Sequence, residues 1–156
     1  MRLTPILICA LLVTGTAVGY DVPSAYNASA FVDNPRAQQN WMLKCQGCHR
    51  ADALTKPLNA PPLAGEISKL LSVPGGREYL ARVPGVATVD LPSDEVAELL
   101  NWTIYRFDPE HIPIDFSPYT GNEIERLRKD PLRVEASAIR KRLHSALNKQ
   151  QNRESN

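Results

Sequence analysis

Two cysteines and a histidine lie within one short segment, Cys45-Gln46-Gly47-Cys48-His49. Two thiols at this spacing on a helical turn can each bond one vinyl group along the same edge of a porphyrin. The next residue then lies under the iron, where its imidazole can act as an axial ligand. The C-x-x-C-H pattern is the attachment signature of c-type haem. It predicts one haem c, bound covalently through Cys45 and Cys48, with His49 as the proximal iron ligand.

The first 19 residues have the three parts of a secretory signal. Arg2 provides the positive start, residues 6–13 (ILICALLV) form an apolar run, and Ala17-Val18-Gly19 is a suitable cleavage site. An uncleaved anchor helix is the alternative, but the apolar run is short for a bilayer span. We therefore expect cleavage near Gly19, a periplasmic location and no membrane span in the mature chain.

Three other kinds of site use the same residue types. A Cys45–Cys48 disulfide would be ordinary in an exported protein. A thioredoxin-like redox pair shares the C-x-x-C spacing, but it needs a βαβ context that the sequence lacks. A zinc site needs four ligands, and the mature chain offers only two cysteines and three histidines. Export favours haem over these alternatives, because c-type haem is attached outside the cytoplasm.

Helix signals dominate the rest of the chain and predict an all-α fold with long loops. Asn34-Pro35 supplies an N-cap and a first-turn proline, so a helix is expected from Pro35 to about Gly47. A second helix begins at Ser93, carries apolar residues at helical spacing and ends at Asp108-Pro109. No segment of useful length alternates as a β-strand would.

The C-terminal region differs in charge from the rest. Residues 20–121 hold 8 Lys and Arg against 12 Asp and Glu, whereas residues 122–156 hold 9 against 5. Thr120-Gly121-Asn122-Glu123 is a capping box, and an amphipathic helix is expected to follow. We expect a signal at 1–19, a haem domain at 20–121 and a basic helical tail at 122–156. This charge is too small for a nucleic-acid partner.

The chain resembles the class I cytochromes c over about residues 35–107. The C-x-x-C-H motif stands at the end of the first helix, as in that family. Residues 60–65 (APPLAG) are similar to the family's proline-leucine-glycine segment, and Pro61 follows His49 at the family's interval. The resemblance implies a helical domain wrapped around the haem, with a C-terminal helical extension here.

The resemblance also assigns roles to three residues around the haem. The carbonyl of Pro61 accepts the second N–H of the proximal histidine, which orients the imidazole. Leu63 packs on the haem. Trp102 belongs to the helix that crosses the first one and packs near the haem. The alternatives are a plain turn at residues 60–65 and a purely structural tryptophan.

The sequence departs from that family at the sixth iron ligand, which is usually a methionine. Met42 lies on the proximal helix, and Val83-Pro84 stands where the family has Met-Pro. His111, in the segment after the second helix, is a candidate for the distal ligand. His144, on the last helix, is a weaker candidate, and an open or water-bound iron is the third possibility. Loss of methionine predicts a lower potential than His/Met ligation gives.

Two arginines in residues 76–82 (GREYLAR) are candidates to bind the haem carboxylates. A guanidinium pairs with a carboxylate through two parallel hydrogen bonds. Arg77 and Arg82 could therefore hold the propionates. The alternative is an ordinary exposed helix face.

These features predict an electron carrier and not an enzyme. The expected partners are periplasmic redox proteins such as a dehydrogenase, an oxidase or a reductase. Two alternatives remain open. The first is a haem-based sensor or enzyme with an open distal site. The second is a dedicated cytochrome subunit of an oxidoreductase complex, with residues 108–156 as its docking arm.

Overall fold

The computed structural model describes residues 28–54 and 60–155, apart from the side chains of Ala28 and Glu154. The expected signal at residues 1–19 lies outside this part of the chain. All the regular elements described are helical, which confirms the predicted all-α class. They are α1 (Ala28–Val32), α2 (Pro35–Asn40), η1 (Trp41–Cys45), α3 (Gln46–His49), η3 (Ser68–Ser72), α4 (Gly76–Arg82), α5 (Pro84–Ala87), α6 (Ser93–Phe107), η4 (Pro109–His111), α7 (Gly121–Arg128) and α8 (Ala136–Glu154).

The first long helix consists of α2, η1 and α3 in succession. Asn34 caps it as predicted, because its Oδ1 accepts a hydrogen bond from the backbone N–H of Ala37 at 3.0 Å. The helix passes through a π-helical turn at η1 and ends at His49, two residues beyond the expected end. The extra residue of a π turn changes the direction of the side chains that follow it. Those side chains include Cys48 and His49.

Helix α6 is the centre of the fold, with the bounds that the sequence predicted. Its Val96, Leu100 and Ile104 belong to the larger hydrophobic cluster, which also includes residues of α4, α7 and α8. Trp102 packs on another side, against the first helix. Its ring centroid lies 5.9 Å from that of Trp41, and its Nε1 donates to the carbonyl of Val32 at 3.1 Å. The two helices are therefore in contact, as expected.

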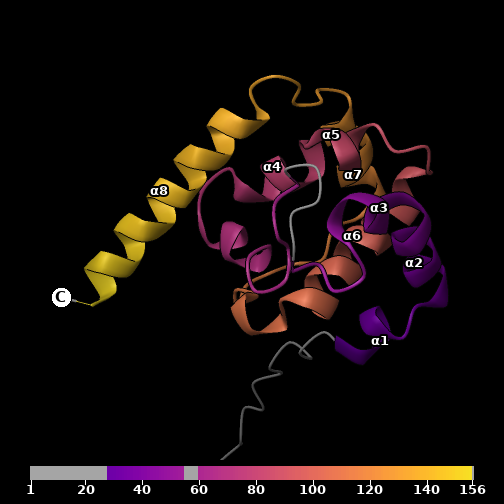
Figure 1. Cartoon of the computed structure of the whole chain (residues 1–156), viewed down its shortest axis with the longest axis horizontal. Coiled ribbons are helices and arrows are strands. Elements are labelled where there is room, and N and C mark those ends of the chain that lie inside the picture. Colours follow the sequence, from indigo (N-terminus) through magenta and orange to yellow (C-terminus); the bar gives the residue numbers. More distant parts are fainter. Residues whose placement is uncertain (1–27, 55–59, 156) are drawn as a thin grey trace, which may run out of the picture.

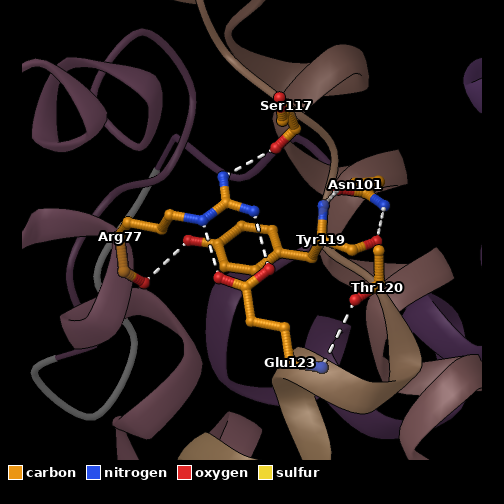
Figure 2. A network of polar contacts seen from close by, with 6 residues as sticks. All are labelled: Arg77, Asn101, Ser117, Tyr119, Thr120 and Glu123. Atoms are coloured by element: carbon orange, nitrogen blue, oxygen red, sulfur yellow. Dashed lines mark hydrogen bonds and ion pairs between the residues drawn. The ribbon is translucent and has the colours of Figure 1, made fainter.

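Residues 108–120 return along α6 as a strap, and a buried asparagine holds the strap in place. The Nδ2 of Asn101 donates to the carbonyl of Tyr119 at 2.9 Å, and its Oδ1 accepts from the backbone N–H of Tyr119 at 2.8 Å (Figure 2). Thr120 then caps α7 by accepting from the backbone N–H of Glu123 at 3.3 Å, as predicted. These hydrogen bonds fix the path of the chain from α6 to α7.

The basic C-terminal segment packs into the larger of the two hydrophobic clusters of the described chain. Helix α8 lies along the outside of the bundle, beside α4 and η3 (Figure 1). The side chains that this segment adds to the larger hydrophobic cluster are Ile124, Leu132, Leu143 and Leu147. Spanning a bilayer takes a longer apolar helix than any found in residues 28–54 and 60–155.

Candidate haem site

A cavity of about 420 Å³ opens beside the cysteines and the histidine of the motif. Cys45, Cys48 and His49 line it at the end of the first helix. The other walls come from the segment that contains Leu63 and from η3, α4, α5, α6 and α8. Most of these lining side chains are aliphatic, so the cavity suits a large flat apolar group that reaches the two thiols.

A hydrogen bond fixes the imidazole of His49. Its Nδ1 lies 3.0 Å from the carbonyl oxygen of Pro61, which is the contact that the resemblance implies. Because a carbonyl can only accept, Nδ1 carries the proton and Nε2 keeps a free lone pair. Burial lowers the pKa of His49, and the charge of Arg140 lowers it further, against the opposing effect of the Pro61 bond. The ring is therefore neutral at neutral pH, as an iron ligand must be.

The two cysteines of the motif, Cys45 and Cys48, are free thiols, and Cys48 is exposed. Burial raises the pKa of Cys45 to about 11, with a smaller contribution from Cys48. A thioredoxin-like redox pair works through a thiol whose pKa is lowered. Cys45 is shifted in the opposite direction, which argues against that alternative.

The described residues do not supply the donors of a metal-ion site. No group of three or more His, Cys, Asp or Glu side chains in residues 28–54 and 60–155 is placed to hold a metal ion.

Trp41, and not Trp102, is the tryptophan that lines the cavity. Its ring centroid lies 6.2 Å from that of His49 and 5.9 Å from that of Trp102. Trp102 therefore lies one layer behind the cavity wall. The Nε1 of Trp41 is buried and has no hydrogen-bond acceptor among the described residues. A buried N–H without an acceptor costs free energy, and a group with polar edges in the cavity could supply the acceptor. The free Nε2 of His49, the two thiols and this indole together fit a haem.

Arg77 and Arg82 both bind other partners and do not line the cavity. Arg77 donates from Nε and Nη2 to the carboxylate of Glu123 at 2.7 Å each, and from Nη1 to the carbonyl of Ser117 at 2.6 Å (Figure 2). Its guanidinium carbon lies 4.2 Å from the ring centroid of Tyr119.

Arg82 pairs with Asp130, donating to its carbonyl at 2.7 Å and to its carboxylate. The expectation that these two arginines hold the haem propionates is therefore not supported. Their role is to hold the strap and the segment after α7 against α4.

Replacing Arg77 by alanine should lower stability without altering the haem. We expect a loss of about 2 kcal/mol, because the variant removes three hydrogen bonds and a stacked cation. Urea unfolding would measure the loss, and the midpoint potential of the loaded protein should stay the same. Arg36→Ala is the matched control, because the ion pair of Arg36 with Glu98 is exposed and its loss should change little. A shifted potential in Arg77→Ala would restore the propionate role.

The structure separates the two histidines considered for the distal position. The Nδ1 of His111 lies 2.5 Å from Oδ1 of Asp108, and His111 borders a different, smaller pocket. His111 is therefore not placed to be the distal ligand. His144 lines the main cavity from α8. Met42 does not line the cavity, and its side chain is 52% exposed.

The sequence argument missed Arg140, which also lines the cavity. No hydrogen bond or ion pair to another described residue is found for its guanidinium. Its spacing from His144, one helical turn, was the signal that could have identified it. The amphipathic pattern predicted for that helix rested on its apolar residues, and the neighbouring polar residue Arg140 was not considered.

Two curated proteins are similar to this chain, and both are named cytochrome c-552. One, from Thermus thermophilus, is 30% identical over 107 residues, covering 57% of this chain and 82% of the relative. The other, from a named strain of the same species, is also 30% identical over 107 residues and is covered to 72%. No family model matches the chain. No solved structure matches it significantly.

Proposed function

The chain belongs to the c-type cytochromes, and from that premise we propose that it is an exported monohaem carrier of single electrons. The observation that carries the proposal is the apolar cavity that has both thiols and the fixed imidazole of His49 on its wall. The haem would supply a one-electron iron couple when bound. The chain's own residues would hold it, orient it and exclude water from it.

Each residue of the motif has a separate task in this proposal. Cys45 and Cys48 would each hold the haem through a thioether, formed by adding the S–H of the thiol across one vinyl group. His49 would bind the iron through Nε2, while the Pro61 carbonyl accepts the Nδ1 proton and fixes the plane of the ring. Leu63 forms part of the cavity wall. Because Cys48 is exposed, a thioether at this position would lie at the surface, where a redox partner can approach.

We further propose a periplasmic location and partners among periplasmic dehydrogenases, oxidases or reductases. The signal at residues 1–19 supports export, which N-terminal sequencing of the exported protein would test. Residues 108–156 are less suited to the role of docking arm, because Leu132, Leu143 and Leu147 bury themselves in the chain's own core.

Voltammetry of the exported, haem-loaded protein tests the carrier function. We expect one reversible one-electron couple per chain, with a midpoint potential below that of a His/Met cytochrome measured in the same cell. A carrier should also exchange electrons rapidly with a small redox-active metal complex. An irreversible couple, or turnover of peroxide at an enzyme's rate, would instead favour a haem enzyme.

A further inference from the structure

We propose that His144, on α8, is the second axial ligand of the haem iron. The inference rests on the proposed function, because it requires a haem in the cavity. It concerns only which of the chain's own side chains completes the iron coordination.

The first argument is the set of donors that the cavity wall offers. His49 and His144 are the histidines that line it, and they come from elements at opposite ends of the described chain. Among the described residues, no methionine lines it. An imidazole is a regular axial ligand of haem, so His144 is the nitrogen donor best suited to the position.

The other lining residues with lone pairs are poorer candidates. Lys44 directly precedes Cys45 and lies on the proximal segment, as His49 does. Burial raises the pKa of Tyr79, which keeps its phenol protonated and a weak ligand. Glu66 is already paired with Lys69 at 3.0 Å.

The second argument is the way in which α8 is held. Leu143 and Leu147 flank His144 and are only 6% and 8% exposed. They fix the helix against η3 and α4. The chain before α8 is tied to α4, because the backbone N–H of Leu132 donates to the carbonyl of Arg82 at 2.8 Å. The backbone of His144 is therefore held at the cavity and is not part of a loose tail.

The third argument is the face that α8 turns to the cavity. Ala136, Arg140 and His144 follow one another at intervals of four residues, so they form one stripe along the helix. The whole stripe lines the cavity, so the first half of α8 forms one wall of the site. His144 is thus part of a built surface and not a single surface histidine.

Spectra of the full, haem-loaded chain test the assignment. We expect the wild type to be low-spin and six-coordinate in both oxidation states and to leave carbon monoxide unbound. His144→Ala should become high-spin when oxidised and should bind carbon monoxide when reduced, and added imidazole should restore the low-spin spectrum. His144→Met, which fills the same space, should stay six-coordinate with a raised midpoint potential.

Two variants separate ligation from general effects on the protein. His111→Ala removes a histidine outside the cavity, and Lys141→Ala changes an exposed position on α8 itself. Both should keep the wild-type spectrum. A low-spin His144→Ala that still excludes carbon monoxide would overturn the ligand, as would a wild type that binds carbon monoxide readily. Either result would leave haem binding intact, whereas a wild type without covalent haem would overturn the proposed function and the ligand together.

Discussion

Replacing Cys45 and Cys48 together by serine is expected to abolish covalent haem attachment. A serine hydroxyl does not form the thioether that each thiol makes with a vinyl group, and His49 alone would hold the haem only reversibly. Intact mass under denaturing conditions should fall by the mass of one haem, apart from the sulfur-to-oxygen changes. Haem staining of a denaturing gel should be lost completely.

The matched control is Met42→Leu, which changes a residue three positions before Cys45. Its side chain is half exposed and does not line the cavity. We expect full covalent loading and an unchanged spectrum, which would also remove Met42 as an iron ligand. A double cysteine variant that still carries haem through denaturation would contradict the proposed attachment site.

The size of the cavity implies that losing the haem should also lower the stability of the protein. Empty apolar volume costs about 24 cal/mol per Å³, so a cavity of about 420 Å³ corresponds to an upper limit of about 10 kcal/mol. A whole domain is stable by only about 5–15 kcal/mol. Water entry reduces the cost, because the cavity is open on one side. Even so, we expect the double cysteine variant to be much more sensitive to proteolysis than the loaded protein.

The parts of this site that the sequence predicted are those set by local signals. Asn34 caps the first helix and Asp108-Pro109 ends α6, and both boundaries depend on residues adjacent in the chain. The interval between His49 and Pro61 also lies within one short segment, and the structure contains the contact that it implied. Caps, turns and short intervals are read directly from neighbouring residues.

The partners of the arginines and histidines could not be predicted in the same way. Arg77 binds Ser117 on the strap and Glu123 on α7, forty and more residues further along the chain. Which segment packs against it depends on the Asn101 bonds that fix the strap's path. The path of the chain also decides which histidine reaches the cavity, since His144 lines it and His111 borders a different, smaller pocket. No local pattern encodes that choice, because it is made by long-range packing.

Asp108→Ala is expected to be the most destabilising of the single substitutions considered. The side chain of Asp108 is 1% exposed, and its Oδ2 accepts a hydrogen bond from the backbone N–H of Ser68 at 2.8 Å. Ser68 is fully buried, so this N–H would lose its partner and could not reach water. We expect a loss of about 3 kcal/mol, since hydrogen bonds to charged groups contribute about 1.5–3 kcal/mol each. Circular dichroism during urea unfolding would measure it.

Two further variants show which part of this contact matters for the cavity. Asp108→Asn keeps an oxygen that can accept from Ser68, so it should cost less than half as much. His111→Ala removes the other partner of the carboxylate. Because the side chain of His111 is 42% exposed, its loss should lower the free energy of unfolding by less than about 1 kcal/mol. Ser68 lies between Ile67 and Leu70, which both line the cavity. Asp108→Ala should therefore also broaden the haem spectrum of the loaded protein. Equal losses of stability in all three variants would show that the stabilisation does not come from the hydrogen bond between Asp108 and Ser68.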